Sequence, residues 1–395
     1  MAVFTDITAP QYQIQLSKIE KAYGLAITSI EGIIQGSSDS LFKITTEELV
    51  APLVLTIHET PDVTPAGLTN EAAQSMIRYM DFIAGAIDKV RDRTGALVNV
   101  AVLKPLQAYS DSEGQAPFVE LDFDGVVKPA SIVPFINGRS YVNSPEERIR
   151  SDDAFHAGQL LAAYLITASS YPNPERFPVC TFERYAGDIV ELSEVEKGWS
   201  GLGYVLSGRR SKGDAAALTG QTYLDELKVS GQRLVEQWRR LVSQEDAFPR
   251  TIVHRDLFAD NVLIDEKGRM VLLDFSEVSY GSIGVDLGVA LISWGSQDGK
   301  LIGGNIARFL QGFDSVIALT AAQLAQLPLY SQFGAFRWET FRIQRIFSQD
   351  PYQMTMRSPA EFQSLRKVWQ DLEQVFVDFS SLEDLVSWAD DPDRK

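Results

Sequence analysis

Length, composition and charge place this chain among folded, acidic proteins. It has 395 residues, of which 45% are hydrophobic and 23% are charged, and this usage excludes extended disorder, collagen and coiled coil as descriptions of the whole chain. The length predicts two or three structural units. The excess of Asp and Glu gives a net charge of −17 that repels a phosphate backbone, so we expect no nucleic-acid partner.

Cysteine usage and hydropathy predict a cytoplasmic protein without membrane association. Cys180 is the one cysteine, so no intramolecular disulfide can form. The first residues, MAVFTDIT, carry neither the basic nor the apolar region of a signal peptide. The longest apolar stretch, 285–294, is shorter than the roughly 18 residues that a membrane span requires.

Strand patterns dominate the chain from about 28 to 135. TSIEGIIQG, SLFKITTE and LVLTIHET predict strands, and a helix follows near 69–93, with Thr69 and Asn70 as candidate N-caps. VNVAVLKPLQAYS, PFVELDF and ASIVPFI predict further strands between turn residues. We therefore expect an antiparallel sheet with one helix packed on it.

Helical spacing dominates after the turn at Asn137 and Gly138. The predicted helices are 151–170, 219–244, 303–312, 320–347 and 359–379. One β-rich stretch, 250–275, interrupts them. The chain is therefore predicted to be an α+β protein with a β-rich lobe at 1–136 and a mostly helical lobe at 137–395.

The segment TIVHRDLFADNVLIDEKGRMVLLDFSEV, residues 251–278, carries the strongest chemical signal. Asp256, Asn261 and Asp274 are spaced so that a loop and the following hairpin bring three oxygen-bearing side chains to one edge. Such ligands suit Mg²⁺, and phosphoryl transfer requires a carboxylate base beside metal-bound phosphates. We interpret Asp256 as the catalytic base, Asn261 and Asp274 as metal ligands, and His254 as a packed residue that supports the loop rather than as a base.

HRDLFADNVLID followed by VLLDFS resembles the catalytic loop and metal-binding motif of the protein-kinase-like small-molecule kinases, the group of aminoglycoside phosphotransferases, choline kinases and the second type of homoserine kinase. The likeness to homoserine kinases is the closest, and it extends to GIIQGSSDSLFKITT, IVPFINGRS and LPLYSQFGAFRWETFRIQR. It implies a bilobal protein-kinase-like fold and an enzyme that uses ATP and Mg²⁺. The implied acceptor is a hydroxyl of a small molecule, homoserine, which would give O-phosphohomoserine for threonine biosynthesis.

The resemblance also assigns roles to residues outside the central motif. The hinge that binds adenine would contain Val133 and Phe135, with Pro134 between them lacking an N–H. Asp286 would brace the catalytic loop. The turn over the nucleotide phosphates would contain Gly36, Ser37, Ser38 and Ser40.

Several features depart from the wider kinase pattern. The strand LVLTIHE offers Thr56 and His58 where protein kinases carry a Lys. Homoserine kinases of this type also lack that Lys. We assign Arg337 to the carboxylate of the acceptor, with a surface or interlobe salt bridge as the alternative, and Trp294 to the same pocket. The segment 171–215 is longer than the resemblance leads us to expect and would reshape the acceptor site.

The sequence leaves other acceptors and one other function open. The acceptor can instead be another amino-alcohol, a sugar or an aminoglycoside. A nucleotide-binding pseudokinase is a further alternative, although it would have no need for both the base and the metal ligands. No GxxxxGK[ST] motif occurs, which excludes a P-loop kinase. We expect a monomer or a homodimer.

Overall fold

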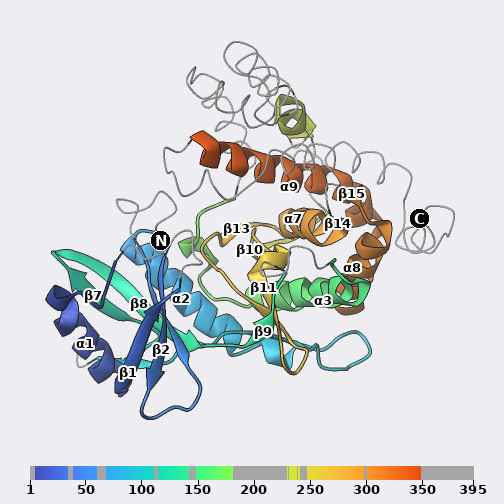
Figure 1. Cartoon of the computed structure of the whole chain (residues 1–395). Coiled ribbons are helices and arrows are strands. Elements are labelled where there is room, and N and C mark those ends of the chain that lie inside the picture. Colours follow the sequence, from blue (N-terminus) through green and yellow to red (C-terminus); the bar gives the residue numbers. More distant parts are fainter. Residues whose placement is uncertain are drawn as a thin grey trace, which may run out of the picture.

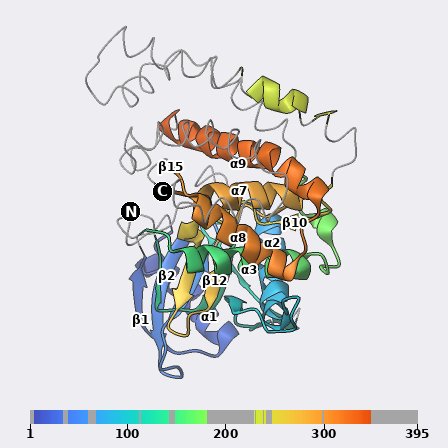
Figure 2. The same ribbon diagram turned by 90° about the vertical axis from the view of Figure 1, so that its right-hand side faces the viewer.

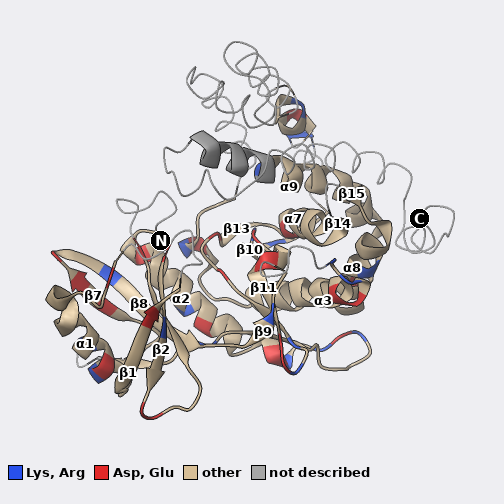
Figure 3. Cartoon of the chain, in the orientation of Figure 1, with Lys and Arg blue, Asp and Glu red and all other residues tan. Residues whose placement is uncertain are grey.

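A computed structural model gives the fold and describes residues 5–33, 39–59, 68–110, 114–141, 148–180, 229, 231–237, 239–240, 247–297 and 300–347. Figure 1 shows a sheet-rich part built from residues up to about 135 beside a helical part built mainly from residue 151 onward. Basic and acidic residues are interspersed over the described elements of both parts (Figure 3). Within the described residues, no helix combines the length and apolar character that crossing a bilayer requires.

The first part is an antiparallel sheet, as the sequence predicts, and it has five strands. Side chains of β2 alternate between buried and half-buried positions, and Phe42 and Ile44 pack with Leu55 of β3 against Ile19 of the first helix, α1 (Gln13–Tyr23). The strands, in their order across the sheet, are β1 (Ile27–Gly32), β2 (Ser40–Thr46), β3 (Leu53–Ile57), β8 (Val126–Pro134) and β7 (Val119–Phe123).

A second helix, α2 (Asn70–Ala84), packs against β8 and faces the helical part. The Thr69 hydroxyl caps it by accepting the N–H of Ala72 at 3.3 Å, as one of the two predicted caps. The helix ends at Gly85 rather than near 93, and only a short 3₁₀ turn, Ile87–Lys89, follows. Glycine favours helix termination because its backbone loses the most freedom in a helix.

One segment of the first half joins the second part. The sequence predicts 98–110 as a strand of the first sheet, but β4 (Val100–Val102) instead pairs in parallel with β12 (Met270–Leu272). That prediction was wrong because Val100 and Val102 bury themselves in the core shared with the helices. The mixed sheet has the order β4, β12, β11 (Val262–Asp265) and β9 (Gly138–Arg139), and β5 (Ala108–Ser110) pairs separately with β6 (Gly114–Ala116).

The helical part is built on close helix contacts. Figures 1 and 2 show α7 lying between α9 and the pair formed by α3 and α8. A Cβ at Gly312 would lie only 1.9 Å from the carbonyl oxygen of Phe155, so glycine is required where α3 and α8 meet. The helices are α3 (Ser151–Ala168), α7 (Ile283–Gly295), α8 (Gly303–Val316) and α9 (Ala321–Phe347), with the short strands β10 (Arg250–Val253), β13 (Ser279–Ser282), β14 (Ser296–Gln297) and β15 (Lys300–Leu301).

Two predicted helices cannot be compared in full. The structure describes only parts of 219–244, and 359–379 lies outside the described residues. The same holds for most of the long segment 171–215, of which 171–180 is described.

Candidate active site

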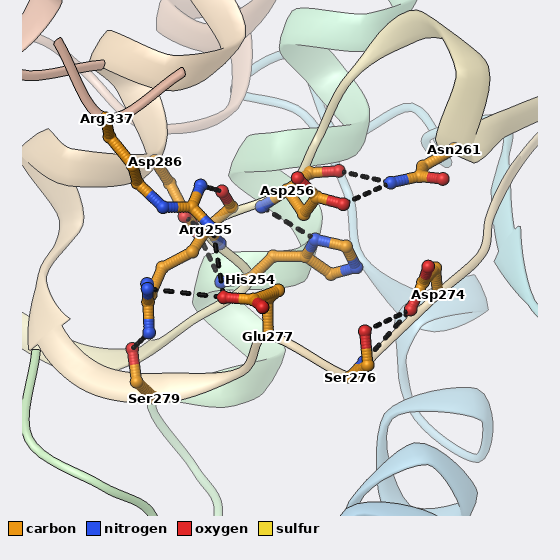
Figure 4. A network of polar contacts seen from close by, with 10 residues as sticks. All are labelled: His254, Arg255, Asp256, Asn261, Asp274, Ser276, Glu277, Ser279, Asp286 and Arg337. Carbon is orange, nitrogen blue, oxygen red and sulfur yellow. Dashed lines mark hydrogen bonds and ion pairs between the residues drawn. The ribbon is translucent and has the colours of Figure 1, made fainter. Parts of the chain in front are cut away.

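A strand, a loop and a hairpin bring the predicted catalytic residues together. β10 enters the core beside β13, and the loop that follows it carries His254, Arg255 and Asp256. The hairpin of β11 and β12 turns at Gly268, whose φ of +73° suits glycine, and returns the chain to Asp274. Figure 4 shows Asp256, Asn261 and Asp274 on one side of this loop.

Asp256 is held by the amide of Asn261. The Asn261 Nδ2 group donates to Asp256 Oδ2 at 2.7 Å and to the Asp256 carbonyl oxygen at 2.9 Å. Burial raises the pKa of Asp256 to about 7, with the carboxylates of Asp274 and Glu277 adding to the rise and Arg337 opposing it. A carboxylate with this pKa can accept a proton near neutral pH.

Asp274 reaches the same region with one carboxylate oxygen occupied. Oδ1 accepts the Ser276 hydroxyl at 2.6 Å and the Ser276 N–H at 3.1 Å. Loss of hydration among the surrounding protein groups raises the pKa of this carboxyl, and the charges of Asp39 and Glu277 raise it further. The residue adopts a φ of +53°, which a non-glycine residue rarely occupies.

His254 supports the loop as a neutral side chain. Nε2 lies 3.1 Å from the Leu273 carbonyl oxygen, so it carries the proton, and Nδ1 accepts the N–H of Asp256 at 3.3 Å. Complete burial lowers the pKa of His254 to about 4. A neutral imidazole with both nitrogens engaged fits the predicted supporting role and leaves it no path to act as a base.

Asp286 braces the loop from α7. Its Oδ2 accepts the N–H of His254 at 2.7 Å and its Oδ1 accepts the N–H of Arg255 at 2.5 Å. The carboxylate is fully buried, which raises its pKa to about 6. Arg255 has a φ of +66°, a conformation that costs a non-glycine residue on the order of 1–3 kcal/mol. The braces therefore hold a strained peptide directly before Asp256.

An ionic cluster that the sequence analysis did not predict lies beside Asp256. Glu277 Oε2 lies 3.0 Å from Arg337 Nη2 and 3.3 Å from Arg255 Nη2 (Figure 4). Arg337 also donates to the carbonyl oxygen of Arg255, and its side chain is only 8% exposed. The structure therefore shows Arg337 in a salt bridge, as the alternative to acceptor contact proposed, but this salt bridge is partly buried within the helical part rather than at the surface or between the lobes.

Trp294 lies under the catalytic loop rather than in a pocket. Its indole is fully buried and its Nε1–H donates to the Leu257 carbonyl oxygen at 3.2 Å. The neighbouring Ser293 hydroxyl accepts the N–H of Ala259 at 2.9 Å. In this structure Trp294 thus supports the catalytic loop rather than lining an open pocket, and its assignment to acceptor binding stays a prediction.

Of the predicted phosphate turn, Gly36, Ser37 and Ser38 lie outside the described residues, and Ser40 is fully buried. The Ser40 hydroxyl accepts the N–H of Thr5 at 2.9 Å and donates to Glu59 Oε1 at 2.6 Å. Lys128 Nζ lies 2.5 Å from Glu59 Oε2. Ser40 thus connects the start of β2 to the buried ion pair of Glu59 and Lys128. This pair joins residues far apart in the sequence, so no local sequence pattern predicts it.

The strand position without a Lys carries a different polar pair. His58 Nδ1 lies 2.9 Å from Asp39 Oδ2, and His58 Nε2 lies 3.2 Å from the Ser131 hydroxyl. Asp39 also accepts the N–H of Glu59 at 3.1 Å. Asp39 lies within the predicted phosphate turn, directly before β2, and its charge adds to the rise that burial causes in the pKa of Asp274.

The hinge residues lie at the end of β8. Val133 is paired in register with Val54 of β3, and its side chain is buried. The N–H of Phe135 donates to the Pro52 carbonyl oxygen at 3.0 Å. This N–H, predicted to lie in the hinge that binds adenine, therefore already has an acceptor within the protein. Lys43 Nζ lies 4.6 Å from the centre of the Phe135 ring. Lys43 was not predicted, and its place on β2 brings a cation beside the hinge.

Comparison with known sequences supports the motif resemblance. The profile described as the phosphotransferase enzyme family matches residues 29–319, more than half of the chain. The homoserine kinase of Neisseria meningitidis serogroup B is 25% identical over 369 residues, which cover 92% of this chain and 98% of that protein. The homoserine kinase of Methylobacterium radiotolerans is 24% identical over 350 residues, which cover 87% and 88% of the two chains.

Solved structures confirm the predicted bilobal, protein-kinase-like fold. An amicoumacin kinase in complex with AMP-PNP and Ca²⁺ superposes with a TM-score of 0.60 at 14% identity, covering 94% of this chain and 96% of that one. A microcompartment-associated aminopropanol kinase superposes with a TM-score of 0.59 at 16% identity, covering 93% and 99%. At these identities the likeness establishes the fold.

Proposed function

This chain belongs to the phosphotransferase enzyme family and is a small-molecule kinase, and on that premise we propose that it transfers the γ-phosphoryl group of ATP to the hydroxyl of homoserine. In this proposal the acceptor hydroxyl meets Asp256, which orients it and takes its proton. The product is O-phosphohomoserine. The new O–P bond forms as the bond between the γ-phosphorus and the bridging oxygen of ADP breaks.

The geometry of Asp256 carries the proposal. Asn261 Nδ2 occupies Asp256 Oδ2 at 2.7 Å, which fixes the orientation of the carboxylate. A pKa raised to about 7 makes this group a stronger proton acceptor than an ordinary Asp while leaving it largely ionised in mildly alkaline solution. General base catalysis of this type contributes about 10²–10⁴-fold to the rate.

The donor set fits a divalent cation bound together with a nucleotide. Because Asn261 uses its amide nitrogen toward Asp256, its amide oxygen remains available as a ligand, and Asp274 contributes Oδ2 beside the occupied Oδ1. One carboxylate and one amide oxygen leave coordination positions for phosphate oxygens, as Mg²⁺ prefers. Such an ion would neutralise charge on the transferring phosphoryl group.

The choice of homoserine rests on the relatives. Two homoserine kinases align over 98% and 88% of their own length, at 25% and 24% identity. The aminopropanol kinase fold neighbour makes other amino-alcohols the natural competitors in a test.

The experiment is ADP release with Mg²⁺ and ATP across homoserine, 1-amino-2-propanol, choline, methylthioribose, aminoglycosides and hydroxylated amino acids. Asp256→Asn should lower turnover by about 10²–10⁴-fold. Asp152→Asn, which removes the same charge from an exposed site at the start of α3, should retain parental turnover.

Each result decides a separate part of the proposal. Homoserine-dependent turnover that Asp256→Asn abolishes supports both the chemistry and the acceptor. Turnover with another acceptor keeps the mechanism and replaces homoserine. Nucleotide binding without turnover on any acceptor would favour a pseudokinase, and full activity of Asp256→Asn would eliminate this residue as the base.

A further inference from the structure

Arg337 connects the long helix α9 to the catalytic loop. Its Nη1 group donates to the carbonyl oxygen of Arg255, and its Nη2 group lies 3.0 Å from Glu277 Oε2. Figure 4 shows the guanidinium beside the peptide that precedes Asp256. With its side chain only 8% exposed, Arg337 acts on the protein interior.

Both backbone polar groups of Arg255, its N–H and its carbonyl oxygen, are held by side chains. Asp286 of α7 accepts its N–H at 2.5 Å, and Arg337 of α9 donates to its carbonyl oxygen. These contacts hold Arg255 at a φ of +66°, and Asp256 follows immediately. Because rotation at Arg255 would swing the next residue, the two contacts position the backbone of Asp256, and Asn261 then orients its carboxylate.

Glu277 allows two guanidinium groups to lie together at this point. Arg255 and Arg337 both pair with Glu277 Oε2, and burial, followed by the charge of Arg337, lowers the pKa of Arg255. Glu277 follows Asp274 by three residues in the sequence. Arg337 therefore fastens both the peptide before the base and the segment that carries a proposed metal ligand.

We propose that Arg337 is a positioning residue that sets the Asp256 carboxylate relative to Asp274 through the Arg255 carbonyl and Glu277. This inference rests on the proposed function, because it concerns the same base and the same ligand. It replaces the role of acceptor contact that the sequence suggested for Arg337. A positioning residue acts after both substrates are bound, so its loss lowers kcat and leaves the two KM values nearly unchanged.

The test compares four variants with the parent in steady-state kinetics at saturating Mg²⁺. Arg337→Met removes both contacts and should lower kcat roughly 10–100-fold, since small misplacements of reacting groups have effects of this size. Arg337→Lys keeps the charge but lacks the planar fork that reaches two acceptors, so kcat should fall by a smaller factor. Both variants should keep each KM within about twofold of the parent value.

Glu277→Gln and the double variant Arg337→Met/Glu277→Gln complete a thermodynamic cycle. If both residues act through one arrangement, the loss of kcat in the double variant should be much smaller than the product of the two single losses. Arg308→Met serves as the control, because it removes an arginine that pairs with Asp152 of α3 and lies on α8. It should retain parental kcat and KM.

Urea unfolding of every variant separates positioning from loss of fold. If Arg337→Met does not fold, Arg337→Lys and Glu277→Gln carry the same test. A rise in the acceptor KM at unchanged kcat would overturn the inference and restore Arg337 as an acceptor contact. Parental kinetics in Arg337→Met would also overturn it. Asp256→Asn is assayed alongside to test the proposed function itself. If this variant retained turnover, Asp256 would not be the base and the proposed function would fail independently of Arg337.

Discussion

Replacement of Lys128 by Met tests the buried ion pair at the root of the first sheet. Lys128 Nζ lies 2.5 Å from Glu59 Oε2 and 2.7 Å from the Thr5 hydroxyl. The two charged side chains are 5% and 0% exposed. Met preserves most of the apolar stem, so the substitution chiefly removes the positive charge, whose Nζ also lies 5.6 Å from the centre of the Phe123 ring.

The expected loss follows from the charge that remains. After Lys128→Met, the Glu59 carboxylate stays buried with the Ser40 hydroxyl as a neutral partner at 2.6 Å. Removing one partner of a buried pair costs about 3–5 kcal/mol in the free energy of unfolding. The double variant Lys128→Met/Glu59→Gln carries no buried charge here, and we expect it to recover at least half of that loss.

Urea unfolding followed by tryptophan fluorescence measures the effect as a lower midpoint at a similar slope. Lys89→Met, which changes an exposed lysine, should shift the free energy of unfolding by no more than about 0.5 kcal/mol. A loss below about 1 kcal/mol in Lys128→Met, or a double variant as unstable as the single one, would show that the pair does not stabilise the sheet as argued.

Three further outcomes are expected. The turnover rate should rise with pH through about 7, because Asp256 accepts a proton only when ionised, and a flat profile between pH 6 and 8 would contradict this. Since folding raises the pKa of Asp256 from 3.8 to about 7, the free energy of unfolding falls as the pH rises through this range, and the loss is complete above about pH 7. Asp256→Asn without metal should therefore be more stable than the parent at pH 8, by on the order of 2–4 kcal/mol, and this gain should vanish near pH 4, as pH-dependent unfolding would test. Gly288→Ala should destabilise the fold by about 1–3 kcal/mol or more in urea, because its Cβ would lie 2.0 Å from the Tyr330 carbonyl oxygen, whereas Gly304→Ala, with open space around it, should not destabilise.

Much of the fold followed from local patterns. The alternation in β2 and β3, the helical spacing of α3 and α8 and the cap at Thr69 act between residues that are close in sequence. The grouping of Asp256, Asn261 and Asp274 was also local, because a single hairpin joins them. Short-range geometry therefore predicted both the class of fold and the core of the candidate site.

The sequence by itself predicted which side chains form the core of the candidate site, whereas only the tertiary structure decided what surrounds them. Arg337 meets the Arg255 carbonyl across 82 residues, and Lys128 meets Glu59 across 69, so neither contact leaves a periodic signal. β4 joined the second sheet because its valines could be buried there. Such choices depend on how whole elements pack, since burial and charge pairing are properties of the assembled core rather than of any segment.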